Sequence, residues 1–276
     1  MSLIVCCSFS GSPGVTTTAL GLALTWPRDV ILADCDRDPA QAIEAGYLRG
    51  VDLGGRGLAP LARAHRERRS LADELPSQLV PLLQHPARSC RYLPGFAHPA
   101  APTVFAPVWP EFAAALAAVA ATGTDVLVDA GRTGREGLPG ALLNEADLVL
   151  VVVRSNLRSL AAARLHLPAL REHLGGLAGP ADIGIAVVGP GMPYSEAEIG
   201  GHFTLPVMAT ITQHPHAAVL TDGEPEPRRF ADAPLMRSFR AAAASLSTGL
   251  MRREAVLETG TASDWATVAH TAGASR

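Results

Sequence analysis

Short apolar runs alternate with helix-like segments along most of the chain. The apolar runs lie at residues 3–9, 30–33, 91–93, 125–129, 147–153, 183–188 and 207–211. The segments with helical spacing lie at residues 16–24, 39–48, 111–121, 155–174 and 234–251. This alternation is typical of α/β proteins, and continuous apolar strands are typical of a parallel sheet that is buried on both faces. The pattern therefore predicts a mainly parallel sheet with helices on both faces.

Two stretches depart from this pattern. Residues 50–110 are rich in Gly, Pro and Arg, and residues 258–276 are small and polar. We predict one domain over residues 1–257, with a variable region at 50–110, and a disordered tail over 258–276. Asp38 and Pro39 indicate an N-cap and first turn for the helix at 39–48. The arginines of the variable region favour a solvated helix face, and the alternative is a docking patch for an acidic partner: Arg63, Arg66, Arg68 and Arg69.

Composition adds one strong constraint, because the chain contains no lysine. All 23 residues counted as Lys+Arg are arginine. A coding bias toward GC-rich codons explains the general scarcity, but the consequence is chemical: no Schiff base, lysine general base or P-loop lysine is available. A net charge of −3 and 5% aromatic residues argue against a nucleic-acid-binding surface.

Cysteine spacing and hydropathy indicate the compartment. The four cysteines form no CxxC pair, so buried reduced thiols are expected rather than disulfides. His214 and His216 flank Pro215, but no third metal ligand follows at suitable spacing. No apolar stretch is expected to reach the roughly 20 residues that span a bilayer, so membrane contact is expected to be peripheral at most. We predict a cytoplasmic protein.

The segment after the first apolar run has a partial phosphate-loop pattern. A P-loop follows GxxxxGK[ST], in which backbone N–H groups and the lysine hold phosphates and the hydroxyl holds magnesium. Gly14 and Thr16 fit this pattern. Phe9 stands at the first glycine position and Val15 at the lysine position. The loop is therefore a degenerate match at the start of a helix, a place that favours anions.

Five segments in order resemble the MinD/ParA group of P-loop ATPases, of the SIMIBI class. They are TTTALGLAL, VILADCDRDPAQA, DVLVDAG, ADLVLVVVRSNLRSLAAARLHL and LPVMATITQHPHAAVLTDGEP. The resemblance covers about residues 2–246 and also extends to the TadZ/CpaE branch, which positions pilus-secretion machinery. It implies a three-layer P-loop NTPase fold, ATP or ADP with magnesium, a homodimer, and protein partners such as secretion, pilus or partition machinery.

The resemblance also assigns roles to residues. It implies cofactor-binding roles for Gly11, Ser12, Gly14, Val15, Thr16, Thr17, Asp34 and Asp129. Thr16 and Asp129 would hold magnesium, and Asp36 would align the attacking water if the site is active. Ser10 and Val15 stand where the family has its two lysines. Gly189 stands at the place of an adenine-reading Asn, and the customary Pro-Glu-Asp after the last core strand is replaced by Thr212, Gln213 and His214.

These departures favour a pseudo-ATPase with weak or absent nucleotide binding, which acts as a spatial-organising or assembly/regulatory factor through protein partners. Losing one charge-assisted hydrogen bond weakens binding about 10- to 100-fold. Losing a preorganised donor to the transition state costs about 10²–10³ in rate. One alternative is a divergent active ATPase, in which an arginine at a strand end replaces the lysine: Arg37, Arg132, Arg135 or Arg154. A second alternative is a nucleotide-independent scaffold that works through residues 56–91.

Overall fold

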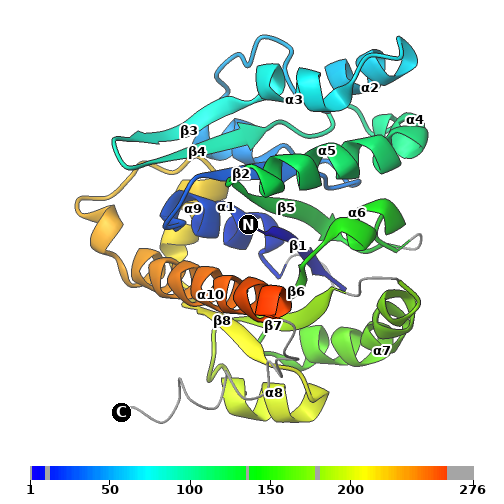
Figure 1. Ribbon diagram of the computed structural model, residues 1–276. Helices are drawn as coiled ribbons and strands as arrows, with labels where there is room; N and C mark the ends of the chain where they lie inside the picture. The colour runs from blue at the N-terminus through cyan, green and yellow to red at the C-terminus, as the bar shows by residue number, and fades with distance from the viewer. Residues whose placement is uncertain (1, 10–12, 135–136, 178–180, 260–276) are drawn as a thin grey trace.

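The computed structural model describes residues 2–9, 13–134, 137–177 and 181–259, and its centre is one eight-stranded sheet (Figure 1). The strand order is β3-β4-β2-β5-β1-β6-β7-β8. The strands are β1 (Leu3–Ser8), β2 (Val30–Asp34), β3 (Val80–His85), β4 (Arg88–Leu93), β5 (Asp125–Arg132), β6 (Leu148–Arg154), β7 (Asp182–Val188) and β8 (Val207–Ile211). Every neighbouring pair is parallel except β3 with β4. The predicted mainly parallel sheet is confirmed.

Strand β1 lies in the middle of the sheet, between β5 and β6. All six of its residues are buried. Leu3, Val5 and Cys7 pack into the core on one face, whereas Ile4 and Cys6 pack into the core on the other. Successive strand residues point to opposite faces, so an unbroken apolar run is what a strand covered on both sides requires.

Helices cover both faces, which gives the predicted three layers (Figure 1). One face carries α2 (Leu58–Arg66), α3 (Leu71–Gln78), α4 (Ala101–Phe105), α5 (Trp109–Ala121), α6 (Gly140–Glu145), α7 (Leu157–Gly175) and α8 (Glu196–Phe203). The other face carries α1 (Val15–Thr25), α9 (Ala218–Thr221), α10 (Pro234–Thr259) and the π-helix η1 (Ile43–Tyr47). Short 3₁₀ turns lie at η2 (Ala106–Val108), η3 (Pro215–Ala217) and η4 (Phe230–Asp232).

The helix predicted over residues 39–48 is wrong in its extent, because only η1 forms there. Asp38 does not cap a helix. Its backbone N–H instead donates to Asp36 Oδ1 at 2.9 Å, and its carboxylate pairs with Arg132 at 3.3 Å. Gln41 then takes a φ of 50°, a left-handed conformation that interrupts helical geometry. A local turn around Asp36 therefore replaces the first half of the predicted helix.

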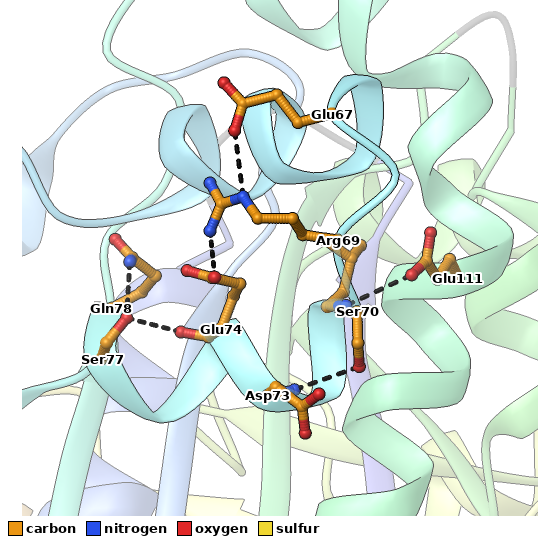
Figure 2. A network of polar contacts seen from close by, with 9 residues as sticks. Glu67, Arg69, Ser70, Asp73, Glu74, Ser77, Gln78 and Glu111 are labelled. Carbon is orange, nitrogen blue, oxygen red and sulfur yellow. Dashed lines mark hydrogen bonds and ion pairs between the residues drawn. The ribbon is translucent and has the colours of Figure 1, made fainter.

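The variable region contains more regular structure than the sequence indicates. The antiparallel pair β3–β4 extends one edge of the sheet, and β4 begins three residues before the predicted run at 91–93. Between α2 and α3, Arg69 pairs with Glu67 at 2.9 Å and with Glu74 (Figure 2). The charge of Arg69 is therefore balanced within its own turn, whereas Arg63, Arg66 and Arg68 are exposed. This arrangement fits the solvated helix face.

One expectation about membranes and one about the tail change. The helical stretch Ala101–Ala121 is long and apolar enough to cross a membrane by length and composition, so the expectation that no such stretch exists is wrong. Phe112 and Leu116 of that stretch are nonetheless fully buried against the sheet, as in a core helix. Helix α10 continues to Thr259, two residues into the segment predicted as a tail, and residues 260–276 lie outside the described chain.

The amino-terminal edge of the sheet is held by the buried carboxylate of Asp125, at the start of β5. Asp125 Oδ1 accepts the Ser2 backbone N–H at 3.0 Å. Asp125 Oδ2 accepts the Trp26 indole N–H at 2.7 Å and pairs with Arg28 at 2.7 Å. One carboxylate thus ties together the start of β1, the end of α1 and the approach to β2.

We expect Asp125→Ala to lower the free energy of unfolding by about 3–5 kcal/mol, because it leaves a buried indole N–H and a partly buried guanidinium without their partner. Urea denaturation followed by circular dichroism measures the change. The control is Asp147→Ala, because the Asp147 side chain is 40% exposed and should cost clearly less. Equal losses in the two variants would contradict this role for Asp125.

Candidate functional site

A cavity of about 360 Å³ opens at the carboxyl-terminal edge of the sheet, beside the start of α1. In open α/β sheets, this edge is where ligands bind. The cavity is lined by the last residues of β6, β7 and β8, by the loops after β1, β7 and β8, and by residues of α1 and α10: Pro13, Gly14, Thr17, Thr18, Arg154, Val188, Met192, Ile211, Thr212, Gln213, His214, Pro215, Ala217, Leu235 and Phe239.

The loop before α1 forms one wall of this cavity. Gly14 has φ 98° and ψ 38°, a left-handed conformation that a residue with a Cβ adopts only with strain. Its carbonyl accepts the Thr18 N–H at 2.8 Å and begins α1. Gly14 and Thr17 therefore lie where the sequence predicts a nucleotide-binding loop. Ser10, Gly11 and Ser12 lie outside the described residues.

Val15 and Phe9, which depart from the P-loop pattern, do not line the cavity. The Val15 side chain is 6% exposed and belongs to the core on the α1 face. The Phe9 ring stacks on His166 of α7, with ring centroids 5.6 Å apart. The cavity therefore stays open. The position of the P-loop lysine is occupied by a core side chain that carries neither a charge nor a hydrogen-bond donor.

Asp34 and Asp129 are brought together as expected, because they are directly paired between β2 and β5. Sequence reasoning missed Tyr92 of β4 and Glu44 of η1, which complete this acidic edge. The Tyr92 hydroxyl lies 2.8 Å from Glu44 Oε1 and 3.2 Å from Asp34 Oδ2. A phenol has one proton to donate, so both contacts are hydrogen bonds only when a carboxyl group carries a proton. Burial, together with the charges of Asp129 and Glu44, raises the pKa of Asp34 well above its usual value.

Asp129 is fully buried at the carboxyl-terminal half of β5. Its Oδ1 accepts the Gly131 N–H at 2.9 Å, and the Thr16 hydroxyl also faces the carboxyl group. Oδ2 has no hydrogen bond of ordinary geometry within the described chain. Burial raises the pKa of Asp129 from 3.8 to about 6, with a further rise from Asp36, against the opposing effects of Thr16 and Gly131.

Thr16 and Asp129 are thus close together, as the predicted magnesium pair requires. The described residues contain no group of three or more His, Cys, Asp or Glu side chains able to hold a metal ion. Magnesium prefers octahedral oxygen coordination and keeps several waters, so it is usually held by one or two carboxylates and substrate phosphates. The orphaned Oδ2 of Asp129 would suit one such ligand position, and a bound nucleotide and water would have to supply the others.

Asp36, the predicted water-aligning residue, lies beside the carboxyl-terminal end of β5. A Cβ added to Gly131 would stand 2.0 Å from the Asp36 carboxyl carbon, so only glycine fits there, and its φ is 58°. Asp36 Oδ1 accepts the Asp38 N–H at 2.9 Å. Burial raises the pKa of Asp36, and the nearby guanidinium groups of Arg132 and Arg37 oppose that rise. Asp36 is therefore held in place by its own turn.

The far end of the cavity differs from the pattern that the resemblance implies. Gly189 presents no side chain, and a Cβ there would lie 2.9 Å from Gln213 Oε1. Gln213 and His214 line the cavity, and the His214 ring packs against His216 with centroids 4.3 Å apart. The polar side chains at this end of the cavity are therefore the Gln213 amide and the His214 imidazole, beside the Gly189 that stands where the resemblance places an adenine-reading Asn.

The solved structures that resemble this chain include ParA and MinD proteins. A ParA family ATPase from Chlorobium tepidum matches with TM-score 0.66 and 16% identity, over 88% of this chain and 98% of that one. The Aquifex aeolicus MinC:MinD complex matches with TM-score 0.66 and 15% identity, over 90% and 96%. Pyrococcus horikoshii MinD with Mg-ADP matches with TM-score 0.65 and 18% identity, over 89% and 95%.

No protein-family model and no curated protein sequence matches the chain. The solved structures share under a fifth of their residues with it, so the likeness lies in the path of the backbone. Membership of the TadZ/CpaE branch stays a prediction. The neighbours and the eight-stranded sheet confirm the expected architecture: the chain has the fold of the MinD/ParA-family P-loop ATPases.

Proposed function

We propose that this chain is a MinD/ParA-like pseudo-ATPase, which binds adenine nucleotide weakly and works as a spatial-organising or assembly factor through protein partners in the cytoplasm. The observation that carries the proposal is the buried Val15 at the lysine position, in a chain without any lysine. A P-loop lysine contacts the β- and γ-phosphates, whose charge must be neutralised during transfer. The Val15 side chain instead packs into the core on the α1 face.

The carboxyl groups of the acidic edge support the proposal that nucleotide binds weakly. Asp34, Asp36 and Asp129 all have raised pKa values, with burial as the largest cause. A cation seated among them would favour their charged forms and lower those pKa values. Without a loop lysine, phosphate oxygens approaching the loop meet these carboxylates with little compensation. Magnesium bound with the nucleotide would supply part of the missing positive charge.

The same residues support the proposal that any hydrolysis of ATP is slow. Asp36 remains at the place that the family resemblance assigns to water alignment, but an aligned water needs electrostatic stabilisation of the transferred group. Removing one preorganised donor from a transition state costs about 10²–10³ in rate. The cavity and its acidic residues would therefore bind nucleotide without hydrolysing it efficiently.

The role through partners rests on the neighbours. One of them is solved as a complex of MinC with MinD, and another is a plasmid partition protein from Borrelia burgdorferi with TM-score 0.60 and 12% identity. By analogy, we propose that this chain acts through protein contacts, including a homodimer. Secretion, pilus or partition machinery is the proposed class of partner.

A divergent but active ATPase is the second candidate. It is favoured by one observation: Arg154 lines the cavity and carries a permanent positive charge. In that case the Arg154 guanidinium would stabilise the transferred phosphate during hydrolysis, as the lysine does, and Asp36 and Asp129 would keep catalytic roles. The two candidates differ in the affinity for ATP and in turnover.

Calorimetric titration of the protein with ATP and magnesium tests the proposal. We expect a Kd on the order of millimolar, because losing one charge-assisted contact weakens binding about 10- to 100-fold. ATP with EDTA in place of magnesium should bind more weakly still. A micromolar Kd for the wild-type chain would contradict the pseudo-ATPase proposal and favour the active ATPase.

The raised pKa of Asp129 gives a pH-dependent prediction. Because the folded chain holds this proton up to about pH 6 and the unfolded chain loses it near 3.8, the stabilisation is present below pH 3.8 and disappears as pH rises through 6. Asp129→Asn should therefore gain about 2–3 kcal/mol relative to wild type between pH 4 and pH 8. Urea unfolding at both pH values measures this. The control Asp232→Asn changes an exposed carboxylate. A wild-type-to-Asn difference that is constant with pH would contradict the buried proton.

Localisation in cells tests the organising role. We expect a fluorescent fusion of the chain to concentrate at defined positions in its native cell, and the Asp36→Asn fusion to keep that pattern, since no hydrolytic cycle drives it. Uniform fluorescence of the wild-type fusion would count against a spatial role. A pattern that disperses on Asp36→Asn would point to the active ATPase.

A further inference from the structure

The structure distinguishes the four arginines that follow strand ends. Arg37 donates to the Thr133 carbonyl at 3.3 Å and to the Gly137 carbonyl, so it is engaged by the loop after β5. Arg132 pairs with Asp38 at 3.3 Å. Arg135 lies outside the described residues. Arg154 lines the cavity.

Arg154 is the last residue of β6, in register with Val188 of β7. Strand β6 also pairs with β1, so the end of β6 stands next to the chain that leads from β1 into the loop. The Arg154 backbone N–H is fixed by the Ser159 hydroxyl at 3.0 Å, at the start of α7. Its main chain is thereby fixed by β7 and by the start of α7, while its side chain is exposed and lines the same cavity as Pro13, Gly14 and Thr17.

The guanidinium of Arg154 makes no hydrogen bond or ion pair with any part of the chain that the structure describes. Among the described residues that line the cavity, it is the one with a permanent positive charge. The other nearby arginines already satisfy carbonyls or a carboxylate. A free guanidinium that shares a cavity with a helix N-terminus is positioned to meet an anion from the side opposite the acidic edge.

We propose that Arg154 is the phosphate-binding cation of this cavity and that it takes the place of the absent loop lysine from a different strand. This inference rests on the proposed function, because it concerns the same nucleotide site. The ligand class is a nucleoside di- or triphosphate: the phosphate chain lies between Arg154 and the loop at Gly14, and the base lies toward Gln213 and His214. Arginine suits this role because its planar group binds phosphate oxygens in pairs.

Placing the cation on β6 has a consequence for activity. A P-loop lysine belongs to the loop itself and contacts the transferred phosphate. Arg154 instead lies at the end of β6, which is separated by β1 from the acidic residues of β2 and β5. It therefore adds affinity for the phosphate chain without recreating the donor that stabilises transfer. This separates binding from turnover and explains how a nucleotide-binding cavity persists in a chain that we propose does not hydrolyse ATP.

The test is a protein-observed NMR titration of the full chain with magnesium–ATP, magnesium–ADP and adenosine. We expect Arg154→Gln to weaken ATP and ADP binding roughly 10- to 100-fold and to leave adenosine binding unchanged. Arg154→Lys should recover part of the loss, because it restores the charge without the paired donors. The matched control is Arg158→Gln, an exposed arginine on α7 outside the cavity lining, which should bind all three ligands as wild type does.

Each other outcome overturns the inference in a recognisable way. If wild type binds ATP and Arg154→Gln binds it equally, Arg154 is not the cation, and the proposed function stands. If Arg154→Gln loses ATP and adenosine equally, the substitution has deformed the cavity rather than removed a phosphate contact. If wild type binds neither ATP nor adenosine, the nucleotide site itself is absent, and both the proposed function and this inference fail.

Discussion

Burial of β1 between β5 and β6, with helices on both faces, is the constraint on which the rest of the structure depends. Because every residue of β1 is buried, its register against β5 and β6 is fixed, and so is the point where the chain leaves the sheet. That point puts Gly14 and α1 beside Asp129, and Arg154 on the opposite side. The acidic edge, the start of α1 and the Arg154 guanidinium are therefore all placed by strand pairing, and the Thr16 hydroxyl faces the Asp129 carboxyl group.

The electrostatics of the site depend on the absence of a cation at the start of α1. Val15 contributes to core packing, so the start of α1 offers backbone N–H groups and hydroxyls but no cation. On the other side, burial holds protons on carboxyl groups that a nearby cation would otherwise ionise. The Tyr92 hydroxyl between Asp34 and Glu44 fits the same state, because it needs a protonated neighbour to complete its contacts. The acidic edge is therefore a place where burial raises the pKa values of carboxyl groups and no lysine lowers them.

Much of the fold could be predicted from sequence, since buried parallel strands appear as unbroken apolar runs. The failures have local causes. The helix predicted at 39–48 was displaced by the Asp36 turn and the left-handed Gln41, neither of which changes the hydrophobic pattern. Strand β3 was missed because it lies at the sheet edge and contains Pro81, which a central strand would exclude. Asp34, Asp36 and Asp129 were assigned from the family resemblance, and they lie at or near the carboxyl-terminal ends of apolar strands, which are visible in sequence. Tyr92 and Glu44 were missed because their approach depends on tertiary packing.

A single-turnover experiment decides whether this site hydrolyses ATP. The wild-type protein, in excess over radiolabelled ATP and with saturating magnesium, is followed for ADP formation beside the Asp36→Asn variant. We expect the two time courses to coincide, because the site lacks the donor that stabilises the transferred phosphate. ADP formation by wild type that is at least about 100-fold faster than by Asp36→Asn would contradict the loss of catalysis. The fold would then carry an ATPase that works without a P-loop lysine.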